Sequence, residues 1–397
     1  MNVRTAVVLA AGEGTRLRPL TQNRPKPMLS AGNRPILEHV LDALVEAGLQ
    51  RLIVVVGYRR TRVQEYFGPD YRGVPIEYVI QEKQLGSGHA LLQARNAADG
   101  PMVVVNGDRI IDADSVSAVA ETFEQGSGVA AMTVKEHDAA HRYGAVRLKD
   151  GEITTLVEKP ERGKFRLINA GIYVFEDSVF DTIEDTPRTD GELVLTDTIT
   201  ELMERDRVAG VKTKGIWVDA TYPWDLLEVT SEVLAEGRVI EPAVAEGVWV
   251  AETATVHEEA TLRAPVVVGP DCVIGPSTVV GPYVALGENT TVGANVTLDN
   301  SVVEADARLV HGSTIIDAVV GQDVHFGPAV TIPGGPADVR VRQEVFEDQR
   351  LGAVVADRVH VGGSTEFEPG ALVGSGAQIG TGCHVRGQIP PGTEVRR

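Results

Sequence analysis

Cysteine is nearly absent from this sequence, with only Cys272 and Cys383 among 397 residues. Two cysteines cannot form a disulfide framework, and their spacing matches no metal-binding motif, so we expect both to be small buried residues. Long apolar runs are also lacking. No run reaches the roughly 18 residues of a membrane span, and the N-terminus lacks the charges and apolar stretch of a signal peptide. These absences argue against a small protein stabilised by disulfides and against a membrane protein. They predict a cytoplasmic protein without a membrane partner.

Positive charge is scarce as well. The chain has 37 Lys and Arg against 56 Asp and Glu, which gives a net charge of −19, and only 8 of the 37 are lysines. Nucleic-acid binding requires a basic face, and no run rich in Lys and Arg occurs, so we expect no nucleic-acid partner. An acidic, lysine-poor surface suits a protein in concentrated salt, where screening weakens repulsion between like charges.

The chain is long enough for two domains, and its first 230 residues alternate short apolar runs with longer amphipathic stretches. We expect strands at residues 5–10, 51–56, 76–80 and 102–106. A helix over 35–47 would start at Pro35 and stop before Gly48. This alternation predicts an α/β domain with a mostly parallel sheet covered on both faces. Ligands bind beyond the carboxyl ends of strands in such sheets, where the sequence places Gly12–Arg16 and Asn106–Asp108.

The second half of the chain has a different period. A six-residue repeat predicts a three-sided parallel β-helix, in which each hexapeptide forms one face and adds its aliphatic residue to a continuous core. A helix or an alternating strand would need a period of 3.6 or 2. The repeating aliphatic residues are Val250, Val256, Leu262, Val268, Ile274, Val280, Leu286, Val292 and Leu298.

This register is interrupted twice. It resumes at Val320, Phe326 and Ile332, and again at Val355, Val361, Phe367, Val373, Ile379 and Val385. We therefore expect extra residues, projecting as loops, between 298 and 320 and between 332 and 355. Loops on a rigid scaffold often carry function. Residues 231–247 are the expected join between the domains.

Polar groups follow the first expected strand in the stretch AVVLAAGEGTRLRPLTQNRPKPMLSAG. Its glycines let the backbone approach a bulky anion, and backbone N–H groups at a strand-to-helix turn bind phosphate. It lacks the Gly-Lys-Ser/Thr of a Walker A loop, and Leu17 stands where a dinucleotide fingerprint ends in glycine. Arg16 and Arg18 offer forked donors for polyphosphate, and Pro25 and Pro27 restrict the backbone around Lys26. A lysine held in this way suits a leaving pyrophosphate.

The segment LAAGEGTRLRPLTQNRPKPML resembles the signature of sugar-1-phosphate nucleotidylyltransferases, which make an NDP-sugar and pyrophosphate from an NTP and a sugar 1-phosphate. The resemblance continues through QEKQLGSGHA, NGD, YGAV, VEKP, NAGIYVF, GELVLTD and WVDATYPWDLLE, in that order. With the repeats behind it, the chain resembles the archaeal type of the bifunctional uridylyltransferase and acetyltransferase family. This implies a Rossmann-like nucleotidyltransferase domain over 1–232, a linker over 233–247 and a left-handed β-helix over 248–397.

The resemblance also implies roles for individual residues. In this chemistry a sugar-phosphate oxygen attacks the α-phosphorus and pyrophosphate leaves, so the protein mainly positions groups and neutralises charge. Arg16 and Lys26 would be catalytic, and Asp108 and Asp219 would be catalytic ligands of Mg²⁺. The positions implied for the nucleotide are Leu9, Ala10, Ala11, Gly12, Gly14, Thr15, Gln81, Gly86 and Ser87. Those implied for the sugar phosphate are Gly144, Glu158, Lys159 and Asn169.

Plainer interpretations of some of these residues remain open. Asp108 could cap a helix, Asp219 could belong to a surface turn, and Glu158 and Lys159 could form a solvated ion pair. We interpret His89 as a packing or capping residue.

The C-terminal domain matches the family less well. His311 stands where the family has the histidine that deprotonates the sugar amine while acetyl-CoA is the co-substrate. However, Thr314 replaces an expected tyrosine, residues 333–335 replace an expected asparagine, and no lysine follows Lys214. These departures favour a structural or oligomerising β-helix, as a trimer or a multiple of one, over acetyl transfer. His325 and His360 are expected to be exposed.

The pattern QLGSGHA, with Ser87 in place of the commoner threonine, favours UTP and N-acetylglucosamine 1-phosphate as substrates, with UDP-N-acetylglucosamine as product. One alternative is a glucose-1-phosphate uridylyl- or thymidylyltransferase with a purely structural β-helix. Another is a non-catalytic regulatory or scaffold subunit. The joint presence of Arg16, Lys26, Asp108 and Asp219 argues against the scaffold.

Overall fold

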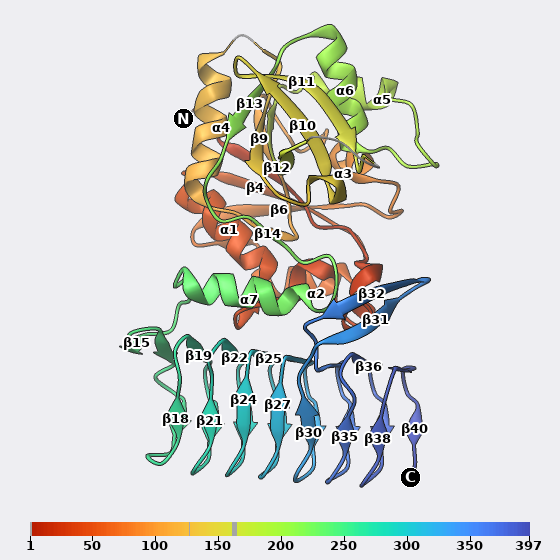
Figure 1. Ribbon diagram of the computed structural model, residues 1–397. Coiled ribbons are helices and arrows are strands. Elements are labelled where there is room, and N and C mark those ends of the chain that lie inside the picture. The colour runs from red at the N-terminus through yellow and green to blue at the C-terminus, as the bar shows by residue number, and fades with distance from the viewer. Residues whose placement is uncertain (1, 127, 161–164) are drawn as a thin grey trace. The chain divides into compact units, whose positions relative to one another are not determined.

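A computed structural model describes residues 2–126, 128–160 and 165–397 (Figure 1). The chain divides into two compact units. Unit 1 comprises Met1–Glu13, Pro25–Met28 and Ile36–Val218, and unit 2 comprises Gly14–Arg24, Leu29–Pro35 and Asp219–Arg397. Among the described residues, no helix is both long and apolar enough to span a membrane.

Unit 1 is built on a ten-stranded sheet with the order β10-β11-β13-β9-β12-β7-β1-β4-β6-β5. Strands β7, β1, β4 and β6 are parallel neighbours, whereas β12 runs antiparallel between β7 and β9. All four strands predicted from the sequence are confirmed. The strands are β1 Thr5–Leu9, β4 Arg51–Val56, β5 Asp70–Tyr71, β6 Val74–Ile80, β7 Met102–Asn106, β9 Ala130–Glu136, β10 Gly144–Lys149, β11 Glu152–Glu158, β12 Leu167–Phe175 and β13 Val208–Lys212.

Both faces of this sheet are covered, as predicted, because successive side chains of a strand point to opposite faces. Ala6 and Val8 of β1 belong to one core, and Val7 belongs to the other. Helices α1 and α4 contribute to the first core, and α3, α5 and α6 contribute to the second. The helices are α1 Ile36–Glu46, α2 Arg60–Phe67, α3 Ser87–Gln93, α4 Ala113–Gln125, α5 Val179–Asp185 and α6 Leu195–Arg205.

Local signals explain where several elements start and stop. Helix α1 begins just after Pro35, and the chain turns away at Gly48, whose φ of +89° favours glycine. The Asp112 carboxylate accepts a hydrogen bond from the Ser115 N–H at 2.8 Å and caps the start of α4. The shorter elements are β2 Ser30–Ala31, β3 Arg34–Pro35, β8 Arg109–Ile110, β14 Val218–Asp219, η1 Thr15–Leu17, η2 Leu20–Gln22, η3 Lys26–Met28 and η4 Ala140–Arg142.

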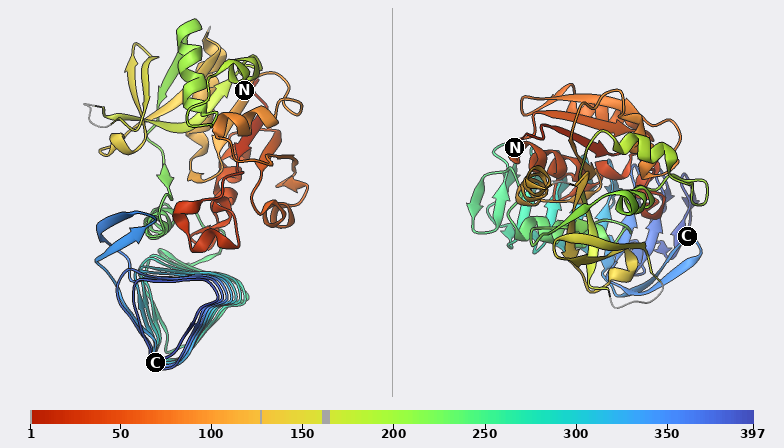
Figure 2. Two further views of the ribbon diagram at one scale, coloured as in Figure 1. Left: turned by 90° about the vertical axis from the view of Figure 1, so that its right-hand side faces the viewer. Right: turned by 90° about the horizontal axis from the view of Figure 1, so that it is seen from above.

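Unit 2 contains the predicted left-handed parallel β-helix, which has a triangular outline when seen along its axis in the left view of Figure 2. Aliphatic side chains from its three sheets form one continuous core, in which Cys272 and Cys383 are buried as predicted. Helix α7, Asp225–Ala235, precedes it. The first sheet contains β15 Ala243–Ala245, β16 Val248–Val250, β19 Val266–Val268, β22 Val284–Leu286, β25 Ser301–Val303, β28 Ala318–Val320, β33 Ala353–Val355, β36 Ala371–Val373 and β39 Gln388–Ile389. The second contains β17 Thr255–Val256, β20 Val273–Ile274, β23 Thr291–Val292, β26 Arg308–Leu309, β29 His325–Phe326, β34 His360–Val361, β37 Gln378–Ile379 and β40 Glu394–Val395. The third contains β18 Thr261–Leu262, β21 Val279–Val280, β24 Thr297–Asp299, β27 Thr314–Ile316, β30 Thr331–Pro333, β35 Glu366–Phe367 and β38 His384–Val385.

The prediction of a projecting loop between residues 298 and 320 is wrong. Val280 pairs with Leu298, one 18-residue turn along the chain, whereas Leu298 pairs with Ile315 after only 17 residues. The corner from Leu298 to Ser301 is one residue shorter than the corresponding corner from Val280 to Val284. Missing corner residues therefore shift the phase of the repeat while the coil continues without a break.

The second interruption is a true insertion. Strands β31, Ala337–Val341, and β32, Glu344–Gln349, form an antiparallel hairpin between β30 and β33. The strands on either side of it still pair directly, with Val320 opposite Val355. The coil is therefore continuous beneath the hairpin, as the sequence predicted.

Candidate active site

The carboxyl ends of β1 and β7 lie side by side in unit 1. Leu9 pairs with Asn106, and the Gly107 N–H donates to the Leu9 carbonyl at 2.9 Å. A Cβ on Gly107 would lie 3.0 Å from the Cβ of Ala10, so a larger side chain would press on this turn. The turn that carries Ala10, Ala11 and Gly12 thus lies beside the one that carries Asp108.

Lys26 and Asp108 form an ion pair, with 2.7 Å between Nζ and Oδ2. The Lys26 side chain is 13% exposed and that of Asp108 is 32% exposed, so the pair is partly shielded from water. Lys26 lies in η3, where the Met28 N–H donates to the Pro25 carbonyl at 3.0 Å. The structure therefore brings together two residues to which the sequence assigned separate roles.

The oxygen donors at Asp108 fit a magnesium ion bound chiefly through substrate. The described residues contain no cluster of three or more His, Cys, Asp or Glu side chains that could hold a metal ion. Mg²⁺ in phosphate-transfer sites is usually held by one or two carboxylates together with substrate phosphates and waters. Asp108 is a suitable ligand for this mode of binding, and in the structure Lys26 balances its charge.

Gln81 lies directly after β6, at the same edge of the sheet as the ends of β1 and β7. It is buried, and its Nε2 donates to the Gly86 carbonyl at 3.2 Å and contacts His89 Nδ1 at 2.9 Å. Burial, together with the charge of Arg188, lowers the pKa of His89, so its neutral ring accepts this hydrogen bond. His89 therefore positions the amide of Gln81, while its interpretation as a packing or capping residue stays a prediction.

The loop before α3 requires glycine. Gly86 has a φ of +100°, and a Cβ on it would lie 2.2 Å from the carbonyl oxygen of Leu193. The next residue, Ser87, uses its hydroxyl to accept a hydrogen bond from the Leu195 N–H at 3.0 Å, at the start of α6. Ser87 thus joins α3 to α6, a contact that the sequence did not reveal.

The residues implied for the sugar gather on β10, β11 and β12. Gly144 pairs with Glu158, and a Cβ on Gly144 would lie 3.3 Å from Glu158 Oε2 and 3.4 Å from the Cβ of Asn169. Asn169 is buried, donates to the Tyr173 hydroxyl at 2.7 Å and accepts from the Gly171 N–H at 3.0 Å. These contacts fix its amide against the strand.

Lys159 follows this cluster with a backbone φ of +43°. Its Nζ lies 3.7 Å from Glu158 Oε1, and both side chains are about half exposed. Such an exposed pair contributes little to stability and leaves both groups open to a ligand.

Arg109 is a neighbour of this cluster that the sequence analysis missed. Its guanidinium lies 5.3 Å from the centre of the Trp217 ring, and a Cβ on Gly171 would lie 2.6 Å from its Nη1. It thus places a cation beside the strand that carries Asn169. The available signal was its position, immediately after Asp108.

Four of the residues predicted for nucleotidyl transfer belong to unit 2: Gly14, Thr15, Arg16 and Asp219. The Thr15 hydroxyl accepts a hydrogen bond from Arg342 Nη2, on the hairpin that interrupts the β-helix. Arg16 is exposed. We refer to Gly14–Arg24, the part of the signature that belongs to unit 2, as the signature segment.

Asp219 accepts a hydrogen bond from the Thr221 hydroxyl at 2.8 Å. Nearby, Asp225 accepts from the N–H groups of Thr221 and Tyr222 at 2.8 and 2.7 Å. Burial raises the pKa of Asp225 to about 6, and the charges of Asp219 and Glu228 act in the same direction. Hydrogen bonds to the carboxylates of Asp219 and Asp225 therefore hold the turn that follows Asp219 in place.

A buried ion-pair cluster anchors the signature segment to the β-helix within unit 2. Arg24 Nη1 lies 2.8 Å from Glu304 Oε2, and Arg24 Nη2 lies 2.5 Å from Asp357 Oδ1. The Ser30 hydroxyl also donates to Glu304 at 2.9 Å. These two carboxylates raise the pKa of Arg24 and offset the opposing effect of burial.

His311, the predicted acetyl-transfer base, is exposed just after β26. Thr314 begins β27, and residues 333–335 lead from β30 into the hairpin, where the Gly335 N–H donates to Asp317 at 3.1 Å. The stretch that stands where the family has asparagine is therefore the base of an insertion. His325 and His360 stack on one sheet, with 4.9 Å between ring centres.

Comparison with known proteins agrees with this architecture. Residues 5–236 match the nucleotidyl transferase family, and residues 262–362 match the GMPPB C-terminal domain. The chain is 35% identical to a "Bifunctional protein GlmU" of Methanococcus maripaludis over 95% of this chain and 93% of that one. It is also 35% identical to the protein of that name from Methanocaldococcus jannaschii, over 98% and 97% of the two chains.

Other similarities cover only part of the chain. "UTP--glucose-1-phosphate uridylyltransferase AglF" of Haloferax volcanii is 37% identical over 58% of this chain and 97% of its own length. The crystal structure of a putative glucose-1-phosphate thymidylyltransferase from Bacillus anthracis matches with a TM-score of 0.55 and 26% identity, over 60% of this chain and 97% of that one. With GlmU proteins aligned over nearly the whole length of both chains, this protein belongs to the GlmU family of nucleotidyl transferases with a C-terminal β-helix.

Proposed function

We propose that the chain is a Mg²⁺-dependent uridylyltransferase that converts UTP and N-acetylglucosamine 1-phosphate to UDP-N-acetylglucosamine and pyrophosphate. The observation that carries this proposal is the partly buried Lys26–Asp108 pair beside the Ala10–Gly12 turn, in a chain similar to GlmU proteins over nearly its full length. The buried amide of Gln81 at the same sheet edge supports a pyrimidine nucleotide.

In this proposal the protein binds and positions charges around an in-line displacement. An oxygen of the sugar phosphate forms a bond to the α-phosphorus, and the bond from that phosphorus to the pyrophosphate oxygen breaks. Lys26 and Arg16 donate to the departing pyrophosphate, because a fixed cation stabilises charge as it develops. The attacking phosphate oxygen is already ionised, so no protein base is required. A Mg²⁺ ion held by Asp108 and Asp219 would supply further charge neutralisation on the phosphates.

The sugar half of the site rests on the cluster of Gly144, Glu158 and Asn169. The small Gly144 leaves room between the two polar side chains, and Asn169 is held rigidly by Tyr173 and Gly171. A carboxylate and an amide can hydrogen-bond sugar hydroxyls, and we assign the sugar phosphate to Lys159, whose side chain is about half exposed beside Glu158.

For the C-terminal domain we propose a structural β-helix that assembles as a trimer, since residues 333–335, at the base of the inserted hairpin, depart from the family pattern for acetyl transfer. Acetyl transfer from acetyl-CoA to glucosamine 1-phosphate, with His311 as the base, is the second candidate, and it is favoured by the bifunctional relatives that cover both domains. Glucose 1-phosphate is the competing sugar substrate, favoured by the similarity of 58% of the chain to AglF.

The test is pyrophosphate release with Mg²⁺, in which UTP, dTTP, GTP and CTP are crossed with the 1-phosphates of glucose, N-acetylglucosamine and glucosamine. Lys26→Gln should remove most turnover, whereas the exposed Lys212→Gln serves as the matched control. Preference for UTP and N-acetylglucosamine 1-phosphate supports the proposal. Preference for glucose 1-phosphate overturns it in favour of the AglF-like activity, and use of glucosamine 1-phosphate only with acetyl-CoA would establish the second candidate.

A further inference from the structure

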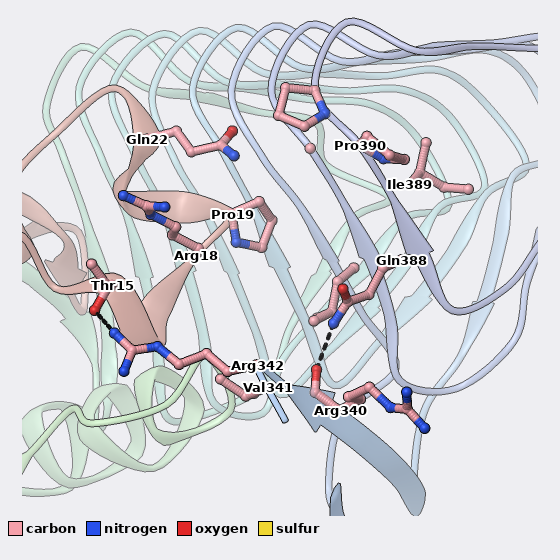
Figure 3. A pocket seen from close by; sticks show the side chains of 13 residues that line it. Thr15, Arg18, Pro19, Gln22, Arg340, Val341, Arg342, Gln388, Ile389 and Pro390 are labelled. Atoms are coloured by element: carbon pink, nitrogen blue, oxygen red, sulfur yellow. Dashed lines mark hydrogen bonds between the residues drawn. The ribbon is translucent and has the colours of Figure 1, made fainter. Parts of the chain in front are cut away.

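A pocket of about 400 Å³ lies within unit 2, among the signature segment, the β31–β32 hairpin and the last turns of the β-helix (Figure 3). This volume falls in the range of small-molecule sites, which is on the order of 300–1,000 Å³. Two of its lining residues, Thr15 and Arg18, were assigned to the nucleotide or its polyphosphate from the sequence, and no role derived above uses the other lining residues. The residues that line it are Thr15, Arg18, Pro19, Gln22, Arg340, Val341, Arg342, Leu372, Gly374, Gln388, Ile389, Pro390 and Pro391.

The charge of the pocket is opposite to that of the protein. Arg18, Arg340 and Arg342 line it, and no carboxylate does so among the described residues. In the part of the chain that the structure describes, neither Arg340 nor Arg342 pairs with a carboxylate, although the protein carries a net charge of −19. Guanidinium groups match the geometry of phosphate oxygens, and a local cationic site can attract an anion to an acidic protein.

The pocket also has an apolar side. In Figure 3 the Arg18 and Arg342 side chains lie on the side of Thr15, whereas Gln388, Ile389 and Pro390 lie on the opposite side. Pro391 and the largely buried Leu372 extend this apolar wall. A ligand that suits both sides carries phosphate at one end and a flat, weakly polar ring at the other.

The hairpin that forms one wall is held in place. Gln388 Nε2 donates to the carbonyl of Arg340 at 2.6 Å and fastens the hairpin to the β-helix. On the hairpin, Phe346 packs against Tyr222 and Trp224, with ring centres 4.4 and 5.2 Å apart. A wall fixed at two points preorganises the pocket and reduces the entropic cost of binding.

From these observations we propose that the pocket is a binding site for a nucleoside phosphate, whose contacts include neither Lys26 nor Asp108. The phosphates are held by Arg18 and Arg342, with Arg340 contributing further positive charge, and the base packs on Ile389 and Pro390. Arg342 also donates to the Thr15 hydroxyl, so a phosphate at Arg342 competes with that hydrogen bond.

The test is isothermal titration of the full-length protein with ADP, compared with adenosine as the phosphate-free probe. The variants are the double substitution Arg340→Gln and Arg342→Gln, the single substitution Lys26→Gln at the transfer site, and Arg263→Gln as a matched control. Arg263 is an exposed arginine at the opposite end of the β-helix sequence, so this control removes a charge without touching the pocket.

We expect ADP to bind the wild type, Lys26→Gln and Arg263→Gln with similar Kd, and the double variant to bind at least about tenfold more weakly, because charge-assisted hydrogen bonds are lost. Adenosine should bind more weakly than ADP by a similar factor. The proposal is overturned by absent ADP binding, by equal binding of ADP and adenosine, or by binding that Lys26→Gln abolishes and the double variant retains. Thermal unfolding of the double variant close to that of the wild type excludes loss of the fold as the cause.

Discussion

Replacement of Arg24 by methionine should destabilise unit 2 strongly, because it leaves two buried carboxylates without their cation. The side chains of Arg24, Glu304 and Asp357 are only 10%, 11% and 6% exposed. Removing one partner of a buried ion pair typically costs about 3–5 kcal/mol. Since 1 kcal/mol shifts the Tm of a unit of this size by about 2–4 °C, we expect the Tm to fall by about 6–20 °C.

The assay is calorimetric unfolding of the full-length protein, with the exposed Arg263→Met as the matched control. A buried pair is screened by salt far less than a surface pair, so the loss should persist in concentrated salt. Arg24 ends the signature segment, and turnover should therefore fall together with stability. A decrease in Tm no larger than that of Arg263→Met, or one that disappears in high salt, would refute the reasoning.

Four further outcomes are expected. Asp108→Asn should lower pyrophosphate release by about a hundredfold or more with the fold intact, since a ligand for charge neutralisation is lost; turnover equal to that of the exposed Asp99→Asn would contradict this. His311→Ala should leave uridylyl transfer unchanged, as a coupled enzyme assay would show, because it lies on the β-helix surface. Asp225 has a folded pKa raised to about 6, so its contribution to stability is complete at pH below its ordinary value of about 4 and is lost as the pH rises through 6. Asp225→Asn should therefore flatten the decline in unfolding free energy between pH 4 and 7, and an unchanged slope would exclude Asp225 as its source. Gly86→Ala should cost about 1–3 kcal/mol in chemical denaturation, because its φ is positive and its Cβ would clash with a backbone carbonyl; a near-normal midpoint would show that the loop can shift.

One departure from the sequence-based expectations comes from the corners of the β-helix. The stretch between residues 298 and 320 reads as an interrupted repeat, yet its strands stay in register because two of its corners, from Leu298 to Ser301 and from Ile315 to Ala318, are each one residue shorter than the corner from Val280 to Val284. A linear period cannot distinguish a missing corner residue from an inserted loop. Pairing with the strand one turn away makes that distinction.

The sequence by itself determined the features that repeat or act locally. The six-residue aliphatic period specified the β-helix, because burial of every sixth side chain in a common core requires a three-sided coil. The apolar runs specified β1, β4, β6 and β7, and the signature identified the turn after β1 as a candidate phosphate site. The domain boundaries and the roles of the site residues remain predictions.

Only the tertiary structure decided which distant charges meet. Lys26 and Asp108 were assigned separate roles from the sequence, and the fold joins them as an ion pair. Nothing in the sequence distinguishes Arg24 from the other arginines of the signature. In the folded structure it forms ion pairs with Glu304 and Asp357. Such contacts carry no local periodicity, because they arise where segments far apart in the chain pack together, and the energies that select them depend on burial created by the fold itself.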